Sequence, residues 1–179
     1  MSTLSDVISR YDSLCSYCDS LWNKAALSSP EHIHCKIGCS GCCELETVCV
    51  IEAIKIAMHL RSAYLEYSSA GVHNYCIFLE SNKCNIYNCR PVICRTHGLL
   101  LKSDEHSFIR SCPFNFQKWQ NSDQSCILDW ESLTMNLMRI NMAFCILAGI
   151  PEYSSERIKL SDIASGNMPD KLKNVNSKL

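Results

Sequence analysis

The chain has 179 residues, of which 47% are hydrophobic and 20% charged, and its formal net charge is −1. This composition is typical of a folded globular protein with a core of its own, and it excludes a disordered tail. The charge gives no reason to expect nucleic acid or an acidic membrane surface as a partner. The first ten residues lack a basic stretch followed by an apolar one, and the longest uncharged apolar run, Phe144–Ile150, is too short to cross a bilayer. We therefore expect a cytoplasmic, reducing setting with no membrane, in which fourteen cysteines need another explanation than disulfides.

Residues 4–26 are predicted to form an amphipathic helix, because apolar side chains recur there every three or four positions. Cys15 and Cys18 lie on the same apolar stripe. Their CxxC spacing leaves metal ligation or redox pairing open, but packing in the core is the favoured interpretation. The Ser28-Ser29-Pro30 sequence ends this helix.

Four cysteines then fall within nine residues: Cys35, Cys39, Cys42 and Cys43. Thiolates this close repel one another unless something positive lies between them, and in a reducing setting this indicates a metal or an iron–sulfur cluster. Gly38 and Gly41 allow the backbone to fold around a small object. Consecutive side chains diverge, so Cys42 and Cys43 fit two metals or two corners of a cluster better than one tetrahedral zinc, unless one of them is a spare.

The remaining chain is predicted to be helical with small hairpins. A second helix is expected over residues 50–67, and residues 76–79 and 84–87 should form strands joined by a turn. Pro91 suits the start of a short helix that carries Cys94 and Arg95. Another hairpin is expected around residues 102–106, and Asp129 is a plausible N-cap for a long helix that Gly149 and Pro151 end.

The predicted fold class is therefore mainly α, with helices around a cysteine-rich irregular centre and one or two small β-hairpins. We expect a single metal-binding cysteine-cluster domain over residues 1–164. The polar stretch 165–179 is expected to be a frayed C-terminal tail.

Four later cysteines extend the candidate site, namely Cys76, Cys84, Cys94 and Cys112. They occur on the predicted hairpin, on the short helix and just beyond it, which gives eight candidate thiolates in all. Eight thiolates are enough for two all-cysteine tetrahedral sites, or for one iron–sulfur cluster with sulfurs beyond its four usual ligands. Each of these four also has the alternative of being a buried core thiol, and core packing is favoured for Cys49 and Cys145.

Three further residues are candidates for contacts around the metal ligands. Arg90 and Arg95 flank Cys94, and we expect their guanidinium groups to neutralise an anionic thiolate site; the alternative is an ion pair with a carboxylate such as Glu44 or Glu80. His97 follows Cys94 by three residues, and donating an N–H to a thiolate is favoured for it over metal ligation.

These residues carry a resemblance to a known family. The combination Cys35-x3-Cys39-x2-Cys42-Cys43, Cys76-x-Phe78-Leu79 and Cys84-x-Ile86-Tyr87-x2-Arg90-Pro91-x2-Cys94-Arg95 is similar to the YkgJ-type cysteine-cluster family, described as a zinc- or iron-chelating domain. The likeness continues through Thr96-His97-Gly98-Leu99, Cys112-Pro113-Phe114-Asn115-Phe116 and Arg139-Ile140-Asn141, and so covers about residues 35–145. Cys89 departs from the family pattern and is either an alternative ligand or a passenger.

The resemblance also bears on which metal is bound. A related cysteine motif in the flagellin lysine methylases is associated with an iron–sulfur cluster, which favours iron–sulfur, as a 4Fe-4S cluster, over zinc. This chain shows no S-adenosylmethionine fingerprint, so methyl transfer is not carried over. We therefore expect a redox, sensing or metal-delivery role with an unknown protein or redox partner. The alternatives are a zinc-stabilised structural or interaction module, and an enzyme that uses an open position on its metal centre.

Overall fold

The structure is a computed structural model that describes residues 2–36, 38–63, 75–103, 109–110, 112–118 and 127–179. Helices make up most of it, and the strands are only two or three residues long. The prediction of a mainly α fold with small hairpins is therefore confirmed. No helix in the described ranges has both the length and the apolar character needed to cross a membrane.

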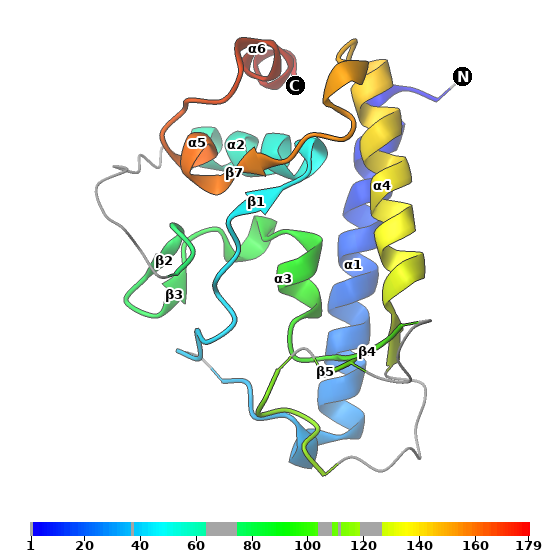
Figure 1. Cartoon of the computed structure of the whole chain (residues 1–179), viewed down its shortest axis with the longest axis vertical. Helices are drawn as coiled ribbons and strands as arrows, with labels where there is room; N and C mark the ends of the chain where they lie inside the picture. Colours follow the sequence, from blue (N-terminus) through cyan, green and yellow to red (C-terminus); the bar gives the residue numbers. More distant parts are fainter. Residues whose placement is uncertain (1, 37, 64–74, 104–108, 111, 119–126) are drawn as a thin grey trace.

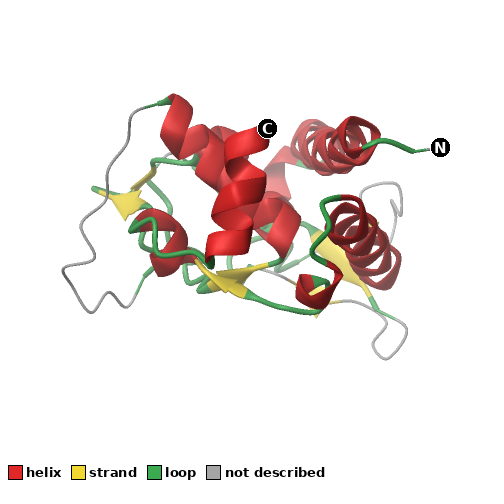
Figure 2. Cartoon of the chain, turned by 90° about the horizontal axis from the view of Figure 1, so that it is seen from above, coloured by secondary structure: helices red, strands yellow, loops and turns green. Residues whose placement is uncertain are grey.

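Two long helices, α1 (Leu4–Ser28) and α4 (Trp130–Leu147), lie side by side (Figures 1 and 2). A capping box begins α1, in which the Thr3 hydroxyl accepts from the Asp6 N–H and the Asp6 carboxylate accepts from the Thr3 N–H. The predicted N-cap of α4 is also confirmed, because Asp129 Oδ1 accepts from the Ser132 N–H at 2.8 Å. Leu133 and Phe144 on α4 are buried in the core, whereas Leu147, the last residue of the helix, is exposed.

A second group of helices covers the other end of the core (Figure 1). Helix α2 (Val50–Ser62) packs against α5 (Leu160–Ala164) and α6 (Asp170–Lys178). Strand β1 (Thr47–Val48) precedes α2 and pairs with β7 (Ile158–Lys159). Helix α2 begins where predicted, and residues 64–67 of the predicted helix lie outside the described residues.

The predicted frayed tail is wrong, because residues 170–178 form α6. Met168, Leu172 and Val175 are buried in the core although their neighbours are polar. Leu172 and Val175 lie three residues apart on one face of α6, and packing against α2 stabilises a helix that its polar sequence alone would not predict. The hydrophobic core therefore extends into the last ten residues of the chain.

Short strands organise the middle of the chain. Strands β2 (Leu79–Glu80) and β3 (Lys83–Cys84) form a hairpin where one was predicted, but the strands are shorter than expected and include Glu80 and Lys83, which were predicted for the turn. The turn residues Ser81 and Asn82 have φ angles of 49° and 60°. These angles are those of the tight hairpin turn that matches strand twist. Strand β4 (Leu100–Lys102) pairs with β5 (Ile109–Arg110) as predicted, and it also pairs in parallel with β6 (Ile127–Asp129), which the sequence did not predict. No local turn links two parallel strands, so no turn signal marked β6.

Between these strands lie two short helical segments. The 3₁₀ turn η2 (Tyr87–Cys89) leads into α3 (Val92–Thr96), whose N-cap is Pro91. Helix α3 packs against α1. It therefore brings Cys94 and Arg95 to the side of the long N-terminal helix. The start of this short helix at Pro91 is as predicted.

Candidate metal centre

The eight candidate ligands come from four stretches of chain. Residues 35–43 form an irregular segment between the 3₁₀ turn η1 (Pro30–His32) and β1, and it meets the β2–β3 hairpin (Figure 1). The Cys76 N–H donates to the Cys43 carbonyl at 2.6 Å, which ties the cluster segment to the chain entering the hairpin. Cys84 lies on β3 opposite Leu79, and Cys94 lies on α3.

Cys35, Cys39, Cys42 and Cys112 form a first set of thiols that interact with one another. Burial raises the pKa of Cys35, and the charges of the other three raise it further, against a lowering hydrogen bond from Asn115. Burial also raises the pKa of Cys42, to about 11, with added repulsion first from its neighbour Cys43 and then from Cys39 and Cys112. We call these four residues the outer set, because the side chains of Cys39 and Cys42 are exposed.

Cys43, Cys76, Cys84 and Cys94 form a second set, which we call the inner set. All four are partly buried and none is fully exposed. Burial raises the pKa of Cys94, and the charges of Cys76, Cys84 and Cys43 add to it. Burial likewise raises the pKa of Cys43, mainly reinforced by Cys84 and Cys76. The inner set therefore joins the irregular segment to the hairpin and α3.

The adjacent residues Cys42 and Cys43 belong to different sets. Their side chains also interact directly, since a hydrogen bond from Cys42 lowers the pKa of Cys43 against the larger effect of burial. The two sets therefore meet at this adjacent pair, because the charge of Cys43 is also the largest thiol contribution to the raised pKa of Cys42. The eight thiols thus fall into two neighbouring groups of four.

Whether this donor set fits a metal depends on both number and position. In the described part of the chain, no three His, Cys, Asp or Glu side chains already stand as a group that could hold a metal ion. The donors themselves fit, because four thiolates are the ligand set of structural zinc sites and of iron–sulfur clusters. Binding would have to draw the sulfurs of each set together. Gly38, at φ +89°, and Gly41 have open space around them on the irregular segment, where this movement would fall.

Asn115 fixes the position of Cys35. Its side-chain amide donates to Cys35 Sγ at 3.3 Å and to the Gly98 carbonyl at 2.9 Å, and its Oδ1 accepts from the His34 N–H at 2.8 Å. Asn115 is buried, so these bonds replace the water that its amide would otherwise bind. Gly98, at φ +95°, has no room for a side chain, because an added Cβ would lie 2.8 Å from Asn115 Nδ2 and 3.2 Å from Cys35 Sγ.

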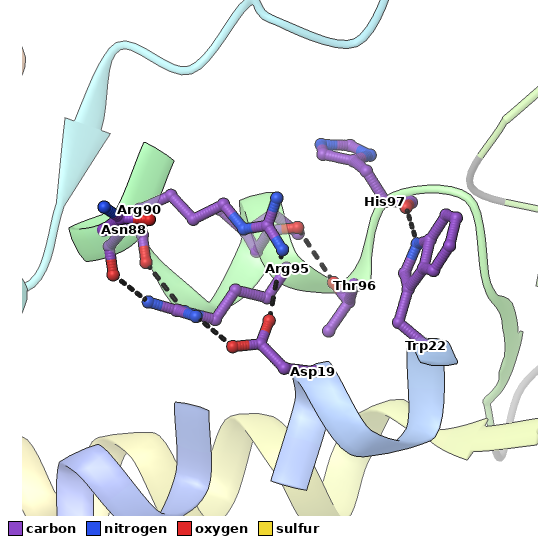
Figure 3. A network of polar contacts seen from close by, with 8 residues as sticks. Asp19, Trp22, Asn88, Arg90, Arg95, Thr96 and His97 are labelled. Carbon is purple, nitrogen blue, oxygen red and sulfur yellow. Dashed lines mark hydrogen bonds and ion pairs between the residues drawn. The ribbon is translucent and has the colours of Figure 1, made fainter. Parts of the chain in front are cut away.

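Arg90 and Arg95 reach α1 rather than a glutamate of the cysteine-rich middle (Figure 3). Arg90 Nη2 lies 3.1 Å from Asp19 Oδ1, and Arg95 Nη1 pairs with Asp19 Oδ2. Arg95 also donates to the carbonyls of Arg90 and Asn88, both at 3.0 Å. Of the two predicted roles, the structure shows the ion pair, with Asp19 in place of Glu44 or Glu80. The charge of Arg90 still acts on the site, since it lowers the pKa of Cys84 against a larger rise from burial.

His97 is held by its backbone. Its carbonyl accepts from Trp22 Nε1 at 3.0 Å, which ties the end of α3 to α1, and its imidazole lies on the side away from α1 (Figure 3). The carbonyl bond and the Asp19 ion pairs together dock α3 on α1. The predicted hydrogen bond from His97 to a thiolate stays a prediction.

The other described cysteines separate into two kinds. The prediction of core packing is confirmed for Cys15, Cys18, Cys49 and Cys145, which are all buried. Cys89 is partly buried and lies near Cys84, whose charge raises its pKa to about 11 after the larger effect of burial. Cys89 therefore borders the inner set, and Cys126 lies outside the described residues.

No family model matches the chain. No curated protein and no solved structure matches it either. The resemblance to the cysteine-cluster family therefore stays a prediction from the motifs, and the site has to be argued from its own geometry.

Three residues that position the site carried little or no sequence signal. Asn115 stood in a motif without a role, and Asp19 is an ordinary acid on an amphipathic helix. Glu52 is buried and joins two elements, because its carboxylate accepts from the Cys49 N–H at 3.1 Å and from the Val92 N–H at 2.9 Å. A buried acid at the third residue of α2 is the one signal that could have been found, since this is the capping-box position.

Proposed function

We propose that this chain is a metal-binding protein that holds its metal in two neighbouring four-thiolate sites. The observation that carries the proposal is the gathering of eight thiols, from segments far apart in sequence, into an outer and an inner set. Thiols lose their protons when they bind a metal, and the thiolates within each set would repel one another without a cation between them.

The fold around the sets supports this proposal. The segments that carry the eight thiols have little regular structure, yet they are tied down by specific bonds such as that from Asn115 to Cys35. A bound metal contributes folding free energy of its own, in addition to that of the hydrophobic core. It would hold together the irregular segment, the hairpin and α3.

For the metal, we propose an iron–sulfur cluster of the 4Fe-4S type first, because the sequence motifs resemble those of a cluster-bearing domain. The role would then be redox transfer, sensing or metal delivery to a partner protein. The exposure of Cys39 and Cys42 supports such a role, because a partner or a reductant could reach that side of the site.

The second candidate is a zinc-stabilised module with one ion in each set. The even division of the eight thiols, with Cys42 and Cys43 in different sets, favours it, because each tetrahedral zinc takes four ligands. In this case the metal has a structural role, and its removal unfolds the middle of the chain.

Metal and sulfide analysis of protein produced and purified without oxygen, in medium containing both iron and zinc, tests the proposal. The iron–sulfur form predicts a brown protein with visible thiolate-to-iron absorption and acid-labile sulfide, whereas the zinc form predicts a colourless protein with two zinc ions per chain. A folded preparation that binds neither metal under these conditions would overturn the proposal. Cys42→Ser and Cys145→Ala are the matched variants, and only the first should reduce the bound metal.

A further inference from the structure

Helices α1 and α4 leave a groove between them on the surface of the molecule. The groove has a volume of about 480 Å³. Its apolar lining comes from both helices and includes Val7, Leu14, Ile140 and Ala143. None of these residues belongs to the two cysteine sets, so the groove is independent of the proposed metal sites.

An exposed apolar stripe on α4 continues this lining. Met135, Met138, Met142 and Ile146 are each between 49% and 60% exposed. At about 100° per residue, these four side chains occupy one side of α4, directly next to the side that lines the groove. Tyr17 on α1, which is 54% exposed, borders the groove from the opposite helix. An apolar surface of this extent on two adjacent helices is typical of an interaction site, and methionines adapt their shape to a bound helix.

The charged side chains that line the groove are both arginines, Arg10 and Arg139. Neither forms a salt bridge with any residue that the structure describes. Arg10 donates only a long hydrogen bond, of 3.4 Å, to the Ser2 hydroxyl. The acid one turn earlier on α1, Asp6, directs its carboxylate to the Thr3 N–H, and the charge of Arg10 is the smallest of the effects that shift the pKa of Asp6. The groove therefore carries two positive charges that an acidic partner would neutralise.

We propose that the α1–α4 groove binds an amphipathic helix of a partner protein, with apolar residues facing the groove and acidic residues facing Arg10 and Arg139. The groove runs along about three turns of α1, from Val7 to Tyr17, which suits a partner helix of about 12–15 residues. Apolar anchors at positions i, i+3 or i+4, and i+7 would fit between the two helices.

A second copy of the chain does not fit this surface as well. A two-fold pairing of α4 with α4 through the exposed stripe would centre between Met138 and Met142. Arg139 would then lie close to the same residue of the other copy, and like charges that meet in an interface cost binding free energy. An acidic helix has the opposite charge and avoids this cost.

The test uses the full-length protein and two labelled helical peptides of about 14 residues. One peptide carries leucines at the anchor positions and glutamates beside them, and the other has lysines in place of the glutamates. Fluorescence anisotropy should show that the glutamate peptide binds at least about tenfold more tightly than the lysine peptide. Arg139→Glu, alone and combined with Arg10→Glu, should abolish or invert this preference, and Met142→Asp should weaken both peptides.

Lys118→Glu is the control for the charge change, because Lys118 is exposed and lies outside the groove. It should leave both affinities unchanged, and circular dichroism should show that every variant keeps its helices. Equal binding of the two peptides, or no binding of either, would overturn the proposal. So would a dimer in sedimentation velocity that Met142→Asp dissociates, or binding to phosphatidylserine-containing vesicles that Arg139→Glu removes, because either result assigns the surface to another occupant.

Discussion

Twelve of the described cysteines fall into two regions that differ in what surrounds the sulfur. Cys15, Cys18, Cys49 and Cys145 lie on α1, at the start of α2 and on α4, and all are buried in the hydrophobic core. The eight cysteines of the outer and inner sets lie on irregular segments, on a short strand or on the five-residue helix α3. Seven of these eight side chains are partly or fully exposed. Only Cys112 among the eight is buried.

The comparison shows that the same side chain lies in two different environments in one molecule. A core thiol packs like a small apolar residue, and burial alone accounts for most of its raised pKa. Burial is the largest cause in the two sets as well, but there the charges of three other thiols add to it, whereas Cys18 in the core is raised by one other thiol, Cys15. A cation bound within a set would attract the thiolates and so favour their ionisation. In the core, an ionised thiol would lose its hydration without such a partner.

The largest expected difference between the two regions is in metal binding. Cys94→Ala should remove the metal of the inner set, so that the metal content per chain falls by about half. It should also lower the free energy of unfolding by more than ~3 kcal/mol, because a structural metal contributes directly to folding. Cys145→Ala should keep the full metal content and cost only about 1 kcal/mol. Elemental analysis and urea unfolding measure both, and equal metal loss in the two variants would contradict the division.

A smaller effect is expected where the backbone supports the outer set. Gly98→Ala should destabilise the protein by about 2–4 kcal/mol, because it strains a left-handed backbone and also displaces the Asn115 amide from Cys35. Gly149→Ala is the matched control, since Gly149 also has a positive φ, of +73°, but has open space around it. It should cost only about 1 kcal/mol for the backbone. If the two variants lose the same stability and bind metal alike, the close approach at Gly98 does not hold the site.

The smallest expected effect is the change with pH that the core thiol of Cys18 causes in the free energy of unfolding. Burial raises the pKa of Cys18 to about 12, with further rises from the charges of Cys15 and Asp19. In the unfolded chain a thiol ionises near pH 8.5, so this contribution to stability is complete below about pH 8.5 and is lost as the pH rises toward 12. The free energy of unfolding should fall by up to about 1.4 kcal/mol per pH unit from this thiol.

Cys18→Ala removes this contribution to the pH dependence of the free energy of unfolding. Urea unfolding at several values between about pH 8 and pH 10 should give a flatter slope for Cys18→Ala than for the unchanged protein in the same metal state. Identical slopes would show that Cys18 ionises as easily in the folded chain as in the unfolded one.

Local signals predicted much of the fold. The stripe on α1, the Asp129 cap of α4 and the turn of the β2–β3 hairpin are all properties of neighbouring residues, and the structure has each of them. Helix α6 and strand β6 escaped prediction because their partners are distant in sequence. α6 depends on its contact with α2, and β6 on its parallel pairing with β4.

For the candidate site, the sequence by itself determined which thiols are available and which segments carry them. It also separated the core thiols on apolar helical stripes from the rest, because helical periodicity is written in local spacing. Only the tertiary structure decided that Cys42 and Cys43 belong to different sets, that Asn115 holds Cys35, and that Asp19 pairs with Arg90 and Arg95. The hydrogen bonds of Asp19 and Asn115 join residues that lie 71 to 80 positions apart in the sequence. The packing of α3 on α1 and the path of the irregular segment bring these residues together. No local sequence pattern encodes either arrangement.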